Sequence, residues 1–210
     1  DMMAKSVLQL AGIDKFVVEP QDSSCQSVLG HTWAFGALPE RSYAGLAPQG
    51  LSMIKVLAIG EVDGFIFDLV SFMPAFKEIK GQELALDAME DTILNLTSAD
   101  VTALTAKGCK IFFGHQTSCQ AMFVPTGCIV AERTNSSPLL YGIRKSLALR
   151  SEASSVSYKA VIDLQKAANR QVKKFEALLT EMQVPTLVAP EPAVVVATAA
   201  ELVVDAVVVA

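Results

Sequence analysis

The stretch that decides the fold is Cys119-Gln120-Ala121-Met122-Phe123-Val124-Pro125-Thr126-Gly127-Cys128-Ile129-Val130. Two β-rich runs, 120–124 and 128–132, flank its Pro-Thr-Gly centre. Proline fixes φ and glycine permits unusual backbone conformations, so a chain can turn sharply at such a point. The stretch therefore predicts a strand, a corner and a second strand that starts directly after the corner.

Further β-rich runs lie on both sides of this corner. Residues 109–113 and 139–145 are expected to form strands. The runs 53–59 and 65–70 flank Gly60-Glu61-Val62-Asp63-Gly64, and an Asp-Gly pair between apolar runs is typical of a hairpin turn. The sequence therefore predicts an antiparallel, β-rich domain over residues 30–150.

Helical patterns precede and follow the corner. Residues 74–107 have a helical pattern, with Thr97 or Ser98 as the cap of a second short helix that runs to Ala106. Apolar residues recur at spacings of three, four or seven over 157–184, which predicts one long amphipathic helix that ends at Pro185. The expected fold class is α+β.

The remaining segments are expected to be peripheral. Residues 1–29 form an N-terminal segment, and residues 185–210 form a Pro-rich linker followed by an apolar C-terminal arm, Ala193–Ala210. The polar side chains of this arm are Thr198, Glu201 and Asp205, and both helix and strand are compatible with the pattern. Such a segment has to be buried against its own fold, another chain or a membrane surface.

Composition excludes several classes of protein. Of the 210 residues, 51% are hydrophobic and 19% are charged, so a globally disordered chain is excluded. The net charge of −5 does not favour nucleic-acid binding. The four cysteines form no CxxC pair and there are two histidines, which argues against a zinc finger.

No uncharged apolar run reaches the roughly 20 residues of a spanning helix, and Asp1 favours a processed chain whose targeting sequence has been removed. The compartment stays open between soluble and membrane-peripheral.

The Phe-Val-Pro-x-Gly corner and the strand after it, over residues 119–146, resemble the late corner of double-stranded β-helix proteins of the cupin and JmjC-like group. The resemblance implies a β-helix-like domain. Active members of that group bind Fe(II) through two histidines and a carboxylate. Here no His-x-Asp or His-x-His is present, His31 and His115 precede the corner, and Cys128-Ile129-Val130-Ala131 follows it. The resemblance therefore implies a fold without the family's metal site, and no metal or cofactor is expected.

Other chemistry has weak support in the sequence. His115 with Cys119 or Cys128 is a candidate nucleophilic pair that lacks an orienting third group. Glu61 and Asp63 are typical turn residues. An aromatic pocket formed by Trp33, Phe35 and Tyr141 competes with a core role for the same residues.

Two surfaces are expected to contact partners. The apolar stripe of the long helix and the arm give the protein-contact candidates, which are Val161, Leu164, Phe175, Leu178, Leu202 and Val203. A basic face on the same helix gives the candidates for an anionic surface, which are Lys159, Lys166, Arg170 and Lys173.

The function favoured by these patterns is a non-catalytic accessory or assembly subunit, which binds other protein chains or itself through the long helix and the arm. A cupin-like metal-dependent oxygenase or isomerase with atypical ligands is the alternative among enzymes. A peripheral protein of an anionic membrane surface is the third reading.

Overall fold

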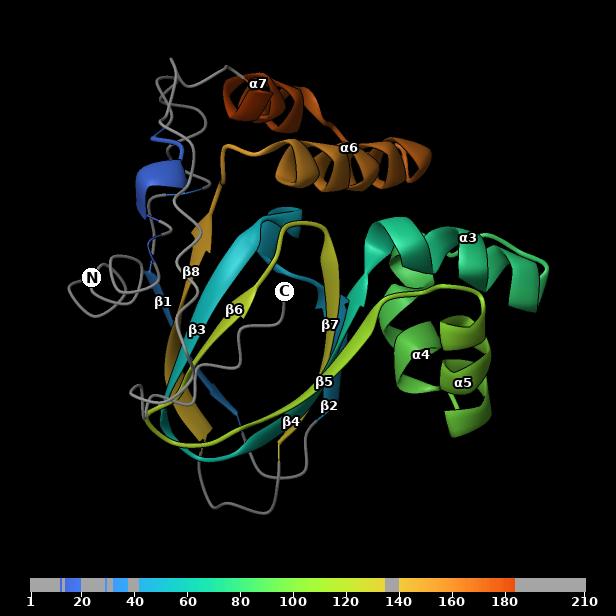
Figure 1. Ribbon diagram of the computed structural model, residues 1–210, viewed down its shortest axis with the longest axis horizontal. Helices are drawn as coiled ribbons and strands as arrows, with labels where there is room; N and C mark the ends of the chain where they lie inside the picture. The colour runs from blue at the N-terminus through green and yellow to red at the C-terminus, as the bar shows by residue number, and fades with distance from the viewer. Residues whose placement is uncertain are drawn as a thin grey trace.

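The computed structural model describes residues 12, 14–19, 29, 32–37, 42–134 and 140–183. This part of the chain folds into two antiparallel four-stranded sheets and five α-helices (Figure 1). The α+β class and the antiparallel, β-rich region predicted from the sequence are confirmed.

The two sheets are open and face one another. The first has the order β1-β8-β3-β6, with β1 (Thr32–Ala37), β8 (Leu140–Leu147), β3 (Ser52–Ile59) and β6 (Ala121–Val124). The second has the order β2-β7-β4-β5, with β2 (Ser42–Leu46), β7 (Cys128–Thr134), β4 (Val62–Asp68) and β5 (Ile111–Gln116). Residues of both sheets form one apolar cluster between them, made of Ala47, Met53, Ile66, Val124, Cys128 and Val130.

The hairpin predicted over residues 53–70 is wrong. Strand β3 pairs with β6 and β8, whereas β4 pairs with β5 and β7, so the two strands belong to different sheets. The Asp63-Gly64 pair lies inside β4 instead of at a turn. The connection is made at Gly60, whose φ of 103° lies in the region that favours glycine.

The Pro-x-Gly corner also joins the two sheets, since it connects β6 to β7. Gly127 has a φ of 72°, its N–H donates to the Gly50 carbonyl over 2.9 Å, and its carbonyl accepts from Leu69 over 3.0 Å. A Cβ at this position would lie 2.7 Å from the Cβ of Ser157. Glycine is therefore required both by the backbone conformation and by the helix that packs on the corner.

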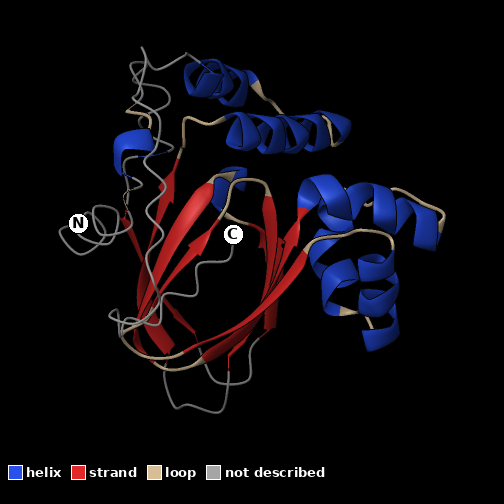
Figure 2. Ribbon diagram, in the orientation of Figure 1, coloured by secondary structure: helices blue, strands red, loops and turns tan. Residues whose placement is uncertain are grey.

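Helices cover the sheets on two sides (Figures 1 and 2). Helices α3 (Leu69–Lys80), α4 (Met89–Leu94) and α5 (Ser98–Ala106) lie beside the second sheet. Helices α6 (Glu152–Ala167) and α7 (Lys173–Gln183) lie across one end of the sheets. The short 3-10 helices are η1 (Asp14–Phe16), η2 (Pro48–Gly50) and η3 (Leu86–Ala88).

Two helix predictions need correction. The single helix expected over 157–184 is the pair α6 and α7, and Asn169 between them has a left-handed φ of 56°. The helical region expected over 74–107 is three helices, the first of which starts at Leu69 because the Asp68 side chain caps it at the N–H of Ser71. No described helix is both long and apolar enough to cross a membrane.

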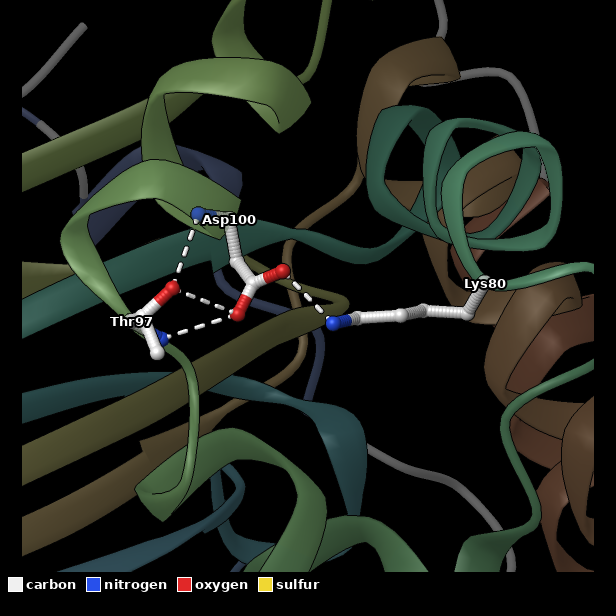
Figure 3. Close-up of polar contacts among 3 residues, drawn as sticks. All are labelled: Lys80, Thr97 and Asp100. Atoms are coloured by element: carbon white, nitrogen blue, oxygen red, sulfur yellow. Dashed lines mark hydrogen bonds and ion pairs between the residues drawn. The ribbon is translucent and has the colours of Figure 1, made fainter.

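The start of α5 agrees with the sequence. Thr97 is its N-cap: the Thr97 hydroxyl accepts from the Asp100 N–H over 3.2 Å, and the Asp100 carboxylate accepts from the Thr97 N–H over 3.0 Å (Figure 3). This is a capping box with Asp at the third helical position. Lys80, the last residue of α3, pairs with the same carboxylate over 2.5 Å and thus joins the two helices.

The largest apolar core lies under the helices. It includes Phe67 of β4, Ile129 of β7, and buried side chains from all five helices, among them Phe72, Leu104 and Tyr158. More of the buried apolar residues of the described chain therefore belong to the core under the helices than to the cluster between the two sheets.

Candidate functional site

The outer face of the second sheet presents three rows of side chains that run across its strands. The register places Leu46, Ile129, Phe67 and Ile111 in the first row, Ala44, Ala131, Phe65 and Phe113 in the second, and Ser42, Arg133, Asp63 and His115 in the third. The first row belongs to or packs against the helix-covered core. The face thus changes from apolar and covered at one end to polar and open at the other.

The helices leave a groove over the outer two rows. It has a volume of about 340 Å³, and its floor is formed by Asp63, Phe65 and Phe113 among others. Leu94 of α4 and Val101 of α5 belong to its wall. A volume of this size lies within the range of about 300–1,000 Å³ that is usual for ligand sites.

Aromatic side chains form the open floor of the groove. Phe113 is 60% exposed and Phe65 is 38% exposed, and their rings lie 5.0 Å apart at 52°. Leu94 beside them is 41% exposed. Strand β5, which carries Phe113, is also an edge of its sheet among the described strands. Apolar side chains and an edge strand are therefore exposed together.

The third row gives the groove a polar end. His115 Nδ1 lies 2.7 Å from the Asp63 carboxylate on the neighbouring strand. Arg133 is exposed and, within the described part of the chain, no carboxylate lies within ion-pair distance of it. The groove therefore combines an apolar floor with a guanidinium that is available to an acidic group.

A second cluster of polar side chains lies between the sheets. Lys55 of β3, which is 2% exposed, pairs with Glu132 of β7 over 2.6 Å. Burial lowers the pKa of Lys55, and the Glu132 carboxylate opposes this shift. Tyr43 and Arg144 lie beside the pair, and burial raises the pKa of the Tyr43 hydroxyl.

Little space is left in this interior. The hollow beside Lys55, Tyr43 and Arg144 has a volume of about 30 Å³, and the adjoining one between β5 and β6 has about 20 Å³. Each is room for one or two water molecules. The Nε of Arg144 is buried without a hydrogen-bond partner in the described residues, so a small polar guest is the occupant that this hollow fits.

The interior does not fit the iron site of the family that the sequence resembles. His115 lies on the outer face of the second sheet and pairs with Asp63, and His31 lies outside the described residues. Glu132 is bound to Lys55. The described residues contain no group of three or more His, Cys, Asp or Glu that could hold a metal ion. No reaction step is derived through such a centre.

The cysteine candidates are not arranged as a nucleophilic pair. Cys128 is buried on the inner side of β7, and burial raises the pKa of its thiol to about 12. Cys119 is exposed at the turn before β6. The hydrogen-bond partner of His115 among the described residues is Asp63. A thiol held in its neutral form is a poor nucleophile.

The predicted contact stripe of the long helix is buried inside this chain. Val161, Leu164 and Leu178 belong to the helix-covered core, and Phe175 packs against it. In this conformation their side chains are not available to a partner. Leu202 and Val203 lie outside the described residues.

The predicted basic face is largely neutralised. Lys159 pairs with Asp163 over 3.2 Å, Lys166 with Glu176 over 2.7 Å, and Arg170 with Asp87 over 2.5 Å. The fourth residue, Lys173, begins α7 instead of continuing α6. The four cations therefore do not form the continuous basic stripe that a single helix would present.

Of the aromatic pocket predicted from Trp33, Phe35 and Tyr141, the structure describes the side chain of Tyr141 alone, which is exposed on β8. The groove on the second sheet was missed because Phe65 and Phe113 follow the same alternation as core residues. Only the positions of the helices decide which of them is covered.

Comparisons with known proteins give no further guide to this site. No protein-family model matches the sequence, and no curated protein matches it.

Proposed function

We propose that this chain is a non-catalytic accessory or assembly subunit that binds other protein chains, and that the groove on the second sheet is its contact surface. The observation that carries the proposal is the pair of exposed, contacting rings Phe65 and Phe113, which the helices leave open on the groove floor. The long helix, which the sequence favoured as the contact element, is replaced in this role because its apolar stripe is already buried.

Physical arguments support a protein as the occupant. Aromatic side chains are enriched at the centres of protein interfaces, where they bury a large area at little cost in side-chain entropy. Exposed edge strands are normally protected by charges, Pro or a covering element. Strand β5 reads Ile111-Phe112-Phe113-Gly114-His115-Gln116 and has no Lys, Arg or Pro. A partner that covers this edge and the adjacent rings would remove both exposed features.

We also propose that the two sheets form a double-stranded β-helix, or jelly roll, in which eight strands make two four-stranded sheets. Two observations support this. The strand orders β1-β8-β3-β6 and β2-β7-β4-β5 place successive strands alternately in the two sheets along much of the chain. The Pro-x-Gly corner makes one of these crossings, between β6 and β7.

The native mass of the chain isolated from its own cells tests the assembly role. We expect the wild-type chain to elute and scatter light as part of a larger assembly, and Phe113→Asp to release it as a monomer. Val156→Asp is the matched control, because Val156 is 54% exposed on α6 and lies outside the groove. A wild-type chain that is a clean monomer, or equal masses for all three proteins, would overturn the proposal.

A small-anion site between the sheets is the second candidate function. The observation that favours it is Arg144, whose buried Nε has no partner in the described residues while Glu132 already neutralises Lys55. A single-atom anion such as chloride, which fits a hollow of this size, should then raise the thermal stability of the wild type but not that of Arg144→Met. Arg133→Met, which removes a guanidinium from the opposite face of the second sheet, should leave this response unchanged.

A further inference from the structure

The groove sets three requirements for the segment that fills it, namely apolar side chains, an acidic group and a matching length. Apolar side chains would pack on Phe65, Phe113 and Leu94, and a carboxylate would pair with Arg133. The second and third rows cross four strands, so three strand spacings separate their ends, or about 14 Å. An extended peptide covers this distance with about four residues. The matching ligand is thus a short segment with several aliphatic side chains and at least one acid.

The chain itself contains such a segment. Residues 193–210 consist of Ala, Val and Leu except for Thr198, Glu201 and Asp205, and they include no Lys or Arg. The run Glu201-Leu202-Val203-Val204-Asp205 places three aliphatic residues between two carboxylates. Either end of this run supplies an acid and three apolar residues in a row, which is the composition and the length that the groove requires.

We propose that the groove binds this C-terminal segment, residues 193–210, with an acid of the 201–205 run on Arg133 and the aliphatic residues over Phe65 and Phe113. The inference rests on the proposed function, since it names the chain that the contact surface takes. The segment lies outside the described residues, and it is its sequence that matches the groove.

The segment is within reach of the groove. Glu201 follows Gln183, the last residue of α7, by 18 residues. An extended chain of that length spans up to roughly 60 Å. The tether therefore allows the segment to enter the groove of its own copy or that of a second copy, and either arrangement joins an apolar segment to an apolar groove.

Disulfide trapping in the full chain tests the proposal. Leu94→Cys on the groove wall is combined with Val203→Cys, in a background that carries Cys25→Ser and Cys119→Ser. We expect a disulfide to form rapidly between positions 94 and 203 under mild oxidation. The matched control combines Val156→Cys with Val203→Cys, because position 156 is at least as accessible but lies outside the groove. Non-reducing mass analysis then shows where the bond lies. A bond between two chains supports both the segment as the occupant and the assembly role, whereas a bond within one chain supports the segment as the occupant but contradicts the groove as a surface for other chains.

A charge exchange tests the role assigned to Arg133. Arg133→Glu should slow trapping about tenfold, in line with the loss of a charge-assisted hydrogen bond. Glu201→Lys together with Asp205→Lys should restore trapping in the Arg133→Glu chain. Trapping at position 94 no faster than at position 156, or a rate that none of these charges changes, would overturn the inference. The trapping rates do not depend on the native mass of the protein. The trapping test and the native-mass test can therefore give opposite answers, and a failure of one proposal can be told apart from a failure of the other.

Discussion

The space between the two sheets and the core outside them are built from different residues. Between the sheets, the apolar cluster of six buried residues shares the interior with Lys55, Glu132 and the Ser52–Thr126 hydrogen bond. Under the helices, the core is apolar and contains a row of contacting aromatic rings, Phe67, Phe72 and Phe76.

This difference separates two tasks. Hydrophobic burial is the dominant favourable contribution to folding, so most of the stability should come from the helix-covered core. The groove continues the outer face of the second sheet beyond that core. Here the helices no longer cover the sheet, and the rings of Phe65 and Phe113 are exposed. Stability and the proposed partner binding therefore depend on one apolar face, whereas the interior between the sheets holds a specific charged pair.

Truncating a ring in the helix-covered core should have the largest effect. Phe72 is fully buried between Phe67 and Phe76, with ring centroids 5.4 and 5.5 Å away. Phe72→Ala should reduce the free energy of unfolding by about 4 kcal/mol, measured by urea titration. Phe112→Ala, which truncates a partly buried ring against the inter-sheet cluster, is the matched variant and should cost clearly less. Equal losses would remove the distinction between the two regions.

Breaking the charged pair between the sheets should have the next largest effect. Glu132→Gln leaves the Lys55 ammonium buried without its carboxylate, which should cost about 3 kcal/mol at neutral pH. Replacing both residues, by Lys55→Met with Glu132→Leu, should cost much less, because neither charge of the pair then remains buried without its partner. Urea unfolding at fixed ionic strength measures both. A double variant less stable than Glu132→Gln would contradict this account.

The pH dependence of the same variant follows from the lysine. Burial lowers the pKa of Lys55 in the folded state, and Glu132 opposes this, so Glu132→Gln should lower it further. As the pH rises from the folded pKa toward the usual lysine value, the folded protein releases the proton while the unfolded chain keeps it, and stability rises. The difference between wild type and Glu132→Gln should therefore shrink as the pH is raised from neutral toward the usual lysine pKa. A constant difference would show that Lys55 does not titrate there.

The corner between the two regions gives a smaller effect. Gly127→Ala combines left-handed backbone strain with a Cβ placed 2.7 Å from Ser157. Gly108→Ala introduces the same strain at a φ of 82°, but no atom lies within 4 Å of its Cβ. Gly108→Ala should cost about 1 kcal/mol and Gly127→Ala about 1 kcal/mol more, measured by thermal unfolding. Equal costs would mean that α6 adapts freely to the corner.

Local features of this fold could be predicted from the sequence, and pairing between distant strands could not. The strands on both sides of Pro125-Thr126-Gly127 and the cap at Thr97 follow from residues within a few positions of each other. The assignment of β3 and β4 to different sheets does not follow from nearby residues. Strands that are neighbours in sequence usually pair, and Asp63-Gly64 resembles a hairpin turn, so the sequence favours a hairpin there. Instead of forming a turn, Asp63 lies within β4, and its carboxylate contacts His115 on the neighbouring strand β5.

The candidate site was missed for a related reason. An alternating apolar pattern predicts a buried face, and it is correct for Phe67, but Phe65 and Phe113 lie where the helices end. Likewise the apolar stripe of 157–184 is a true amphipathic pattern, yet its partner is this chain's own core. Sequence patterns identify the faces that need covering, and tertiary structure decides which of them stays uncovered.

The smallest effect is expected at the surface connection between the helices that border the groove. Thr97→Ala removes the N-cap of α5 and should cost about 1 kcal/mol.

Asp100→Asn acts through charge: the hydrogen bond from Lys80, together with those from Thr97, lowers the pKa of Asp100 to about 2. A carboxyl group whose folded pKa is lowered stabilises the fold above its ordinary value of 3.8, and this contribution is lost as the pH falls toward 2. Wild type should thus exceed Asp100→Asn in stability at neutral pH, and the two should converge near pH 2 in urea titrations. Glu83→Gln, which removes the exposed pair with Lys77 outside any cap, is the control and should change this acid response less. If Asp100→Asn lost no acid dependence, the cap would not hold α5 against α3, and the groove wall at Val101 would need another support.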